Sequence, residues 1–244
     1  MTMQIAIVAK DGLVLASDTK YRPIERHQSD ASIPSGLFNA PKIFLCEHHS
    51  IAVAFAGWTD DVFLAGEELA GHLDAIPIVN DQNIRDVLVT WGNSYYEKMR
   101  PGFLQAAGLL LQLLVVRPSE QYPILKLYVS DQSRTRISTS YMVNGHETNT
   151  TIFWPEYARA ADDDKPDLSA AISIAAITIL MGAEINDHGI GGLEIWQYTN
   201  GWKRVPDDEI EALRTRFDHL QSVIAKTILP NSKRGQSAQQ PSRE

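Results

Sequence analysis

The segment from Met3 to Asp18 contains the pattern that most constrains the fold of this chain. Between Met3 and Val8 the side chains alternate in two sets, and a period of two is typical of a β-strand. Asp11-Gly12 follows, a dipeptide that favours a tight turn between two strands. Leu13 to Ala16 then continues as an apolar strand that ends at Ser17-Asp18. These residues predict an N-terminal β-hairpin.

The remaining strands and helices are predicted from the period of the apolar residues. Strands are expected at 42–46, 51–55, about 109–117, 123–130, 134–143, 192–198 and 202–205, and helices over about 60–76, 83–99, 168–184 and the segment after Pro206. Hairpin-fed strands with clustered helices favour an α+β fold. We expect one domain over 1–230, a polar and disordered tail over 231–244, and a long loop at 19–41.

Composition excludes several classes of function. The formal net charge is −8 and no block of Lys and Arg is interleaved with aromatic residues, so no nucleic acid partner is expected. The longest apolar run, Leu109 to Val116, is too short to span a bilayer, and the N-terminus lacks the pattern of a signal peptide. With a single cysteine, Cys46, a reducing compartment is expected, and we predict a cytoplasmic protein without membrane contact. Cys46 itself is either a small buried apolar residue or a reactive thiol.

Four segments resemble those of a known family. The opening Met1-Thr2-Met3-Gln4-Ile5, continued by Lys10-Asp11-Gly12 and by Leu15-Ala16-Ser17-Asp18, is similar to the start of mature proteasome β-type subunits. Lys42-Ile43-Phe44, Ala54-Phe55-Ala56-Gly57 and the loop Asp187-His188-Gly189-Ile190-Gly191-Gly192 resemble three further segments of those proteins. These proteins are N-terminal-nucleophile hydrolases, the threonine peptidases of proteasomes.

The resemblance implies a fold, an assembly and a substrate. The implied fold is a four-layer αββα sandwich, in which two stacked antiparallel sheets lie between helical layers. The implied assembly is a homo-oligomer of stacked rings with its sites facing an inner chamber. Peptides or unfolded proteins are the implied substrates, and a regulatory unfoldase is an implied partner.

Thr2 is the candidate nucleophile. A threonine hydroxyl needs a base within hydrogen-bond reach, and its own α-amino group, with a pKa near 8, can serve once Met1 is removed. The resemblance gives Lys42 and Asp18 the role of tuning this pair, and makes the Gly57 N–H the donor to the oxyanion; Asp187 completes the implied site. No metal or organic cofactor is required. The alternatives are a solvated lysine, a turn aspartate and a glycine needed only for its turn.

Two departures from the family pattern leave the activity open. Two serines of the family help to orient the terminal amine, but here His146 follows Gly145 at the first position and Ile190 occupies the second. The change slows the enzyme, shifts the role of base to His146, or marks a subunit that no longer cleaves; His146 can equally be an exposed loop residue. The sequence thus leaves three functions: a threonine endopeptidase, a non-catalytic ring subunit, and a hydrolase of small amides.

Overall fold

The computed structural model describes residues 2–21, 38–57, 62–76, 80–81, 83–99, 109–145, 165–185 and 190–228. The chain divides into two compact units, Met1–Val205 and Pro206–Glu244. The division falls inside the single domain that is expected over 1–230, and that domain stays a prediction. The tail at 231–244 lies outside the described residues.

The N-terminal sheet is built on the predicted hairpin. Its five antiparallel strands lie in the order β10-β1-β2-β11-β12. Strands β1 and β2 pair from Gln4↔Ser17 to Val8↔Leu13, as the alternation and the Asp11-Gly12 turn predict. The strand bounds are β1 Met3–Val8, β2 Leu13–Ser17, β10 Tyr141–Gly145, β11 Glu194–Tyr198 and β12 Trp202–Arg204.

A second sheet of five antiparallel strands lies below the first, in the order β5-β6-β7-β8-β9. A short 3₁₀ turn, η1 (Glu47–His49), joins β5 to β6. The predicted loop at 19–41 begins and ends in a small two-stranded ribbon, β3 (Lys20–Tyr21) with β4 (Phe38–Asn39). The bounds in the second sheet are β5 Ile43–Cys46, β6 Ile51–Gly57, β7 Leu109–Val116, β8 Ile124–Ser130 and β9 Arg134–Ser138.

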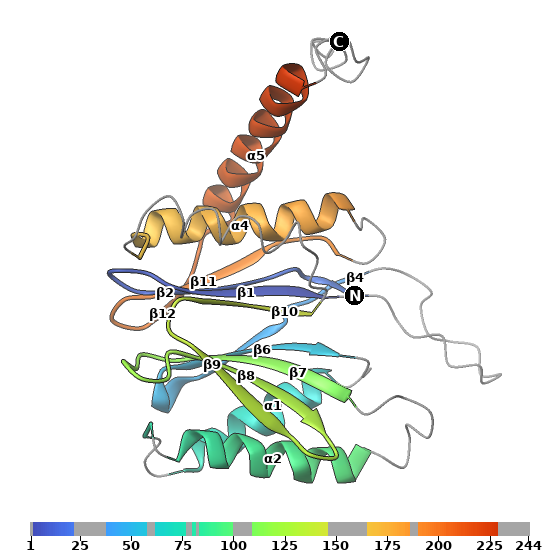
Figure 1. The fold of residues 1–244 in the computed structure, drawn as a ribbon, viewed down its shortest axis with the longest axis vertical. Helices are drawn as coiled ribbons and strands as arrows, with labels where there is room; N and C mark the ends of the chain where they lie inside the picture. The colour runs from blue at the N-terminus through green and yellow to red at the C-terminus, as the bar shows by residue number, and fades with distance from the viewer. Residues whose placement is uncertain are drawn as a thin grey trace, which may run out of the picture. The chain divides into compact units, whose positions relative to one another are not determined.

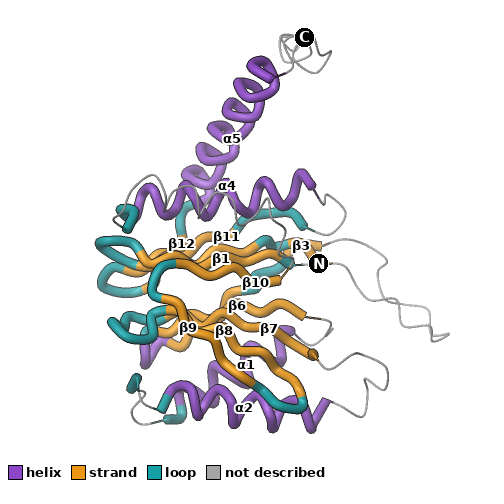
Figure 2. The backbone as a smooth tube through the Cα atoms, viewed as in Figure 1, coloured by secondary structure: helices purple, strands orange, loops and turns teal. Residues whose placement is uncertain are grey.

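Helices cover the outer faces of both sheets (Figures 1 and 2). Helix α4 (Leu168–Ile185) lies on the N-terminal sheet, and α1 (Val62–Asp74) and α2 (Ile84–Met99) lie under the second sheet. One apolar core fills the space between α1, α2 and the second sheet, and another fills the space between the two sheets. The expected four-layer αββα sandwich is therefore confirmed.

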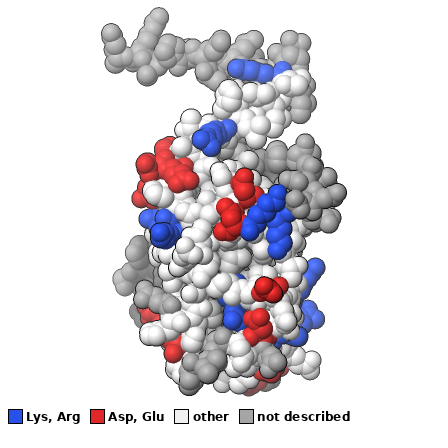
Figure 3. Space-filling model, turned by 90° about the vertical axis from the view of Figure 1, so that its left-hand side faces the viewer, with Lys and Arg blue, Asp and Glu red and all other residues white. Residues whose placement is uncertain are grey.

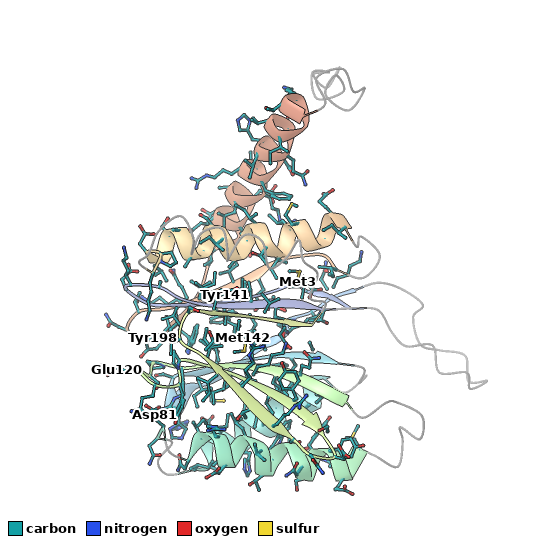
Figure 4. The ribbon with its side chains drawn as sticks, viewed as in Figure 1. Met3, Asp81, Glu120, Tyr141, Met142 and Tyr198 are labelled. Carbon is teal, nitrogen blue, oxygen red and sulfur yellow. The ribbon has the colours of Figure 1, made fainter. Side chains whose placement is uncertain are left out.

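The two faces of the N-terminal sheet are distinguished by the side chains in Figure 4. Met3 points toward α4, where its sulfur contacts Gly182, whereas Met142 points into the space between the sheets. Since side chains alternate along a strand, Thr2 and Gln4 lie on the face opposite to Met3. Thr2 and Gln4 therefore face the inter-sheet layer.

Helix α4 is the one helix of the described residues that is long and apolar enough to cross a membrane. Its buried residues, among them Ala175 and Ile179, lie on the side that packs on β1 and β2. A core helix that is covered by a sheet shows the same apolar composition. The packing accounts for the composition of α4.

The single strand expected at 134–143 is wrong. Residues 134–138 form β9 at the edge of the second sheet, and 141–145 form β10 beside β1 in the N-terminal sheet. Thr139-Ser140 carries the chain from one sheet to the other, and the Ser140 carbonyl accepts the Val8 N–H at 2.7 Å. No glycine or proline interrupts residues 134–143, so the sequence carries no signal that the pairing partner changes.

The unit Pro206–Glu244 contains α5 (Asp207–Ile228). Pro206 precedes the helix, and its carbonyl accepts the Ile210 N–H at 3.0 Å. Asp207, Asp208 and Glu209 lie in the first turn, where negative side chains favour the helix dipole. The helix start predicted after Pro206 is confirmed.

Candidate active site

Thr2 immediately precedes β1 and is half-buried. The neighbouring residue on β10 is Gly145, which pairs with Met3 and has a φ of 86°. A Cβ atom at Gly145 would collide with the carbonyl oxygen of Thr2. A residue without a side chain at 145 therefore lets the backbone of Thr2 pass close to β10.

Lys42 lies just before β5, and its side chain is only 1% exposed. Its Nζ atom donates hydrogen bonds to Thr2 Oγ1 at 3.0 Å, to Asp18 Oδ2 at 2.9 Å and to the Lys20 carbonyl oxygen at 2.8 Å. An ammonium group has three N–H donors, so each has an acceptor here. Lys42 is thus held against Thr2 by groups from two other segments.

Asp18 is held from both sides. Its Oδ1 atom accepts the Met3 N–H at 2.8 Å, and its own N–H donates to the Met3 carbonyl at 3.0 Å. Its other carboxylate oxygen accepts from Lys42. The side chain is 0% exposed, so this carboxylate is fixed next to the residue that follows the nucleophile candidate.

Burial acts on the charges of both partners. It lowers the pKa of the Lys42 ammonium, and the adjacent Asp18 carboxylate opposes that change. Burial likewise raises the pKa of Asp18, while Lys42 and the Met3 N–H act in the opposite direction. The charges are shielded from water, so the field of the ammonium at Thr2 Oγ1 is stronger than it would be on an exposed surface.

The direction of the Lys42–Thr2 hydrogen bond decides what the hydroxyl can do. Because Nζ donates to Oγ1, the proton of the Thr2 hydroxyl points to another acceptor. A cation at 3.0 Å also stabilises negative charge that develops on Oγ1 when the proton leaves. The arrangement suits a nucleophile whose proton moves to a separate base.

Gly57 is the last residue of β6 and is exposed. Two residues earlier on this strand, the Phe55 N–H donates to the Lys42 carbonyl at 3.2 Å. Backbone N–H groups two residues apart on a strand point to the same side. The Gly57 N–H is therefore directed to the side of β6 on which Lys42 lies.

Of the three other residues singled out in the sequence, the structure describes Ile190 alone. His146 and Asp187 lie outside the described residues. Ile190, which occupies the position of a family serine, is 1% exposed and approaches Gly182 of α4. Its side chain fills apolar space under the helix and offers no hydrogen-bonding group.

Gln4, Gly145 and Glu194 were missed by the sequence reasoning. Gln4 and Glu194 are buried on the inter-sheet face, at positions where an alternating strand normally carries an apolar residue. A polar residue at such a position is a signal that the sequence does contain. The close approach at Gly145 leaves no such signal, because a glycine after Asn144 reads equally well as an ordinary turn.

Cys46 is fully buried in the core between the second sheet and its helices. Burial, with a smaller contribution from Asp74, raises the pKa of its thiol to about 12. Of the two interpretations of Cys46, the buried apolar residue is confirmed. Within the described residues, no group of three or more His, Cys, Asp or Glu side chains could hold a metal ion.

Comparison with known proteins gives the fold. No family model matches the chain, and no curated protein matches it. Among solved structures, it resembles Anbu (ancestral beta-subunit) from Yersinia bercovieri, with a TM-score of 0.63 and 16% identity over 100% of both chains. It also resembles the Anbu Gly-1 mutant from Hyphomicrobium sp. strain MC1, with a TM-score of 0.62 and 11% identity over 100% of both chains.

These findings correct the family expected from the sequence. The segments around Thr2, Lys42 and Gly57 indicated a proteasome β-type subunit, but no family model matches, and the Yersinia and Hyphomicrobium structures that share the fold are Anbu proteins. At 16% and 11% identity the likeness establishes the fold alone.

Proposed function

We propose that this chain is a threonine-type amide hydrolase that cleaves peptide bonds with Thr2 as an N-terminal nucleophile. The observation that carries the proposal is the hydrogen bond from Lys42 Nζ to Thr2 Oγ1 at 3.0 Å. The same Nζ atom donates to Asp18 Oδ2 at 2.9 Å. The proposal requires that Met1 be removed, because only then does Thr2 carry a free α-amine.

The reaction begins at the hydroxyl of Thr2. Its Oγ1 atom attacks the carbonyl carbon of the substrate, and the hydroxyl proton passes to the α-amine of the same residue. The Lys42 ammonium, which already donates to Oγ1, stabilises the negative charge that forms there during the transfer. Asp18 keeps this ammonium charged and in place.

The carbonyl oxygen then becomes an oxyanion, for which the Gly57 N–H is the proposed donor. Collapse of the tetrahedral species breaks the C–N bond, and the α-ammonium gives its proton to the leaving amine. Water, deprotonated by the same α-amine, hydrolyses the ester on Thr2 and restores the free hydroxyl. Each step uses groups of this chain and water alone.

We further propose that the chain works as a ring-forming subunit in the cytoplasm, on peptide or unfolded-protein substrates. The support is the likeness to a protein described as an ancestral beta-subunit. Among the described residues, acidic and basic side chains are interspersed on the face in Figure 3, and they form no extended basic surface there for a nucleic acid.

A non-catalytic subunit is the second candidate, and Ile190 favours it. A buried isoleucine cannot donate a hydrogen bond to orient the terminal amine, as a serine can. The two candidates differ in whether the Thr2 amine and hydroxyl react together with an electrophile.

The test is covalent labelling of the purified protein with a threonine-directed electrophile, followed by peptide mapping. Intact mass first establishes that Met1 is absent. We expect a single adduct on Thr2, no adduct in Thr2→Ala, and slower labelling in Thr2→Ser, which keeps a hydroxyl. An adduct elsewhere, or none on protein that lacks Met1, would refute the enzymatic proposal and support the non-catalytic subunit.

A further inference from the structure

Four polar side chains form a continuous row across the N-terminal sheet, next to the candidate site. The register pairs Asn144 with Gln4, Gln4 with Ser17, and Ser17 with Glu194, so the row crosses four neighbouring strands. All four residues are buried, with exposures of 0% for the first three and 5% for Glu194. We call these four residues the polar row.

Two members of the polar row bond the same pair of residues in the other sheet. The pair is Lys42 and Phe55. They lie opposite each other, one position beyond the Ile43↔Ala54 pair in the antiparallel register of β5 and β6. The Gln4 amide donates to the Phe55 carbonyl at 2.7 Å, and the Glu194 carboxylate accepts the Lys42 backbone N–H. In a regular ladder these two backbone groups face each other. Here a side chain from the opposite sheet bonds each of them.

The remaining contacts tie the polar row to the other parts of the site. The Phe55 N–H donates to the Lys42 carbonyl at 3.2 Å, so the Lys42–Phe55 pair is bonded from within the second sheet as well. Ser17 Oγ donates to the Asp18 carbonyl at 2.9 Å. The Asn144 amide donates to Gln4 Oε1 at 2.7 Å and fixes the orientation of that side chain.

Resting on the proposed function, we infer that Gln4 and Glu194 are positioning residues for the reaction. They fix the Lys42–Phe55 pair of one sheet against the strand that begins at Thr2 in the other. Lys42 is the cation at Thr2, and Phe55 lies two residues before Gly57 on the same strand. A shift of this pair would therefore move both the cation and the oxyanion donor away from the nucleophile.

If the polar row only held the two sheets together, it would lower the stability of the fold compared with apolar residues. The inter-sheet core around it is apolar, and each buried polar group must find a partner or lower the stability. Asn144 Oδ1 is buried and has no hydrogen-bond partner among the described residues. Apolar side chains of similar size would pack the two sheets without this cost. A requirement for accurate placement of Lys42 and Phe55 explains why polar groups are present.

The test compares Gln4→Met with a matched control at the same interface. Gln4→Met keeps the length of the side chain but removes both of its hydrogen-bonding groups. The control is Lys126→Met, which removes another buried inter-sheet bond, from Lys126 Nζ to the Val143 carbonyl at 3.0 Å, away from the Lys42–Phe55 pair. We measure kcat and KM on a peptide substrate, the labelling rate of Thr2, and the thermal midpoint.

Gln4→Met is expected to lower kcat and the labelling rate at least about tenfold with KM within about twofold. Lys126→Met is expected to lose a similar amount of stability and to keep kcat. If both variants lose kcat in proportion to their stability, or if Gln4→Met keeps the wild-type labelling rate, the inference is overturned. Wild-type protein that does not label at Thr2 overturns the proposed function instead, so the two failures are distinguishable.

Glu194 provides a second pair of variants should Gln4→Met fail to fold. Glu194→Met removes the acceptor for the Lys42 N–H, whereas Glu194→Gln keeps a carbonyl oxygen that can accept it. We expect the methionine variant to lose more of kcat than the glutamine variant at equal thermal stability. Equal losses in the two variants contradict a positioning role.

Discussion

The Nζ atom of Lys42 lies 3.0 Å from Thr2 Oγ1 and 2.9 Å from Asp18 Oδ2, so one buried cation links the candidate nucleophile to a buried carboxylate. Loss of either charged partner leaves the other without its counter-ion in a site where both side chains are 1% exposed or less. We expect Lys42→Met to lower the free energy of unfolding by about 3–5 kcal/mol. Urea unfolding measures this change.

A double variant separates stability from chemistry at the same site. Lys42→Met with Asp18→Leu removes both charges, and apolar replacement of a buried ion pair is often neutral for stability. We expect the double variant to recover most of the stability that Lys42→Met loses. We expect no labelling of Thr2 by the electrophile in either variant. Recovery of labelling together with stability would contradict a chemical role for Lys42.

The proposed base predicts the pH dependence of the reaction. An α-amine has a pKa of about 8 and must be unprotonated to accept the hydroxyl proton of Thr2. We therefore expect kcat/KM to rise with pH and to level off near about pH 8. Protein acetylated at its α-amine should be inactive at every pH; a profile that is flat from acidic to alkaline pH contradicts the amine as base.

Local patterns in the sequence were sufficient to predict most of the helices and strands, but not the contacts between them. The hairpin of β1 and β2 follows from alternation and from Asp11-Gly12, because both are short-range features. Lys42 and Thr2 are forty positions apart, so the contact between them depends on how two sheets stack. Only the resemblance to a known family suggested that contact, and periodicity could not.

The errors have physical reasons as well. Residues 134–143 contain no glycine or proline that would mark the passage of the chain from β9 to β10. Gln4 breaks the alternation of apolar residues, but a single polar residue does not reveal which backbone group it will meet in the other sheet. The partner, the Phe55 carbonyl, is set by tertiary packing alone.

Gly145 should be intolerant of a side chain. Its φ of 86° is unfavourable for other residues, and a Cβ atom would collide with the Thr2 carbonyl oxygen. We expect Gly145→Ala to lower stability by about 1–3 kcal/mol and to reduce the labelling of Thr2 strongly. The control is Gly201→Ala, at a φ of 158° with no atom within 4 Å of the added Cβ, which should label normally. Normal labelling of Gly145→Ala would show that the placement of Thr2 does not depend on this contact.

Cys46 should be inert in the folded protein. A thiolate is the reactive form, and a pKa of about 12 leaves a fraction of about 10⁻⁴ ionised at pH 8. The thiol is also fully buried. We expect iodoacetamide to alkylate the native protein at least about a thousandfold more slowly than the protein in guanidinium chloride. Rapid alkylation of the native protein would mean that the core between the second sheet and α1 opens readily.

Glu194 predicts how stability depends on pH. Burial raises the pKa of this carboxyl, opposed by the Trp196 indole N–H at 2.8 Å, the Lys42 backbone N–H and Arg204. An acid with a raised folded-state pKa holds its proton longer in the folded than in the unfolded protein. Its favourable contribution is therefore complete below the unfolded value of about 4.3 and is lost as the pH rises through the folded-state value.

Glu194→Gln removes this dependence, because glutamine does not ionise. The stability of the wild type relative to this variant should fall as the pH rises above about 4.3, by about 1.4 kcal/mol for each pH unit between the unfolded-state and folded-state pKa values. Urea unfolding of both proteins at several pH values measures the difference, and Glu184→Gln, on an exposed part of α4, shows the effect of removing a surface carboxyl. A wild type that gains stability over the variant as the pH rises would mean that Glu194 is stabilised as a carboxylate, and that its bonds to Trp196 and Lys42 outweigh its burial.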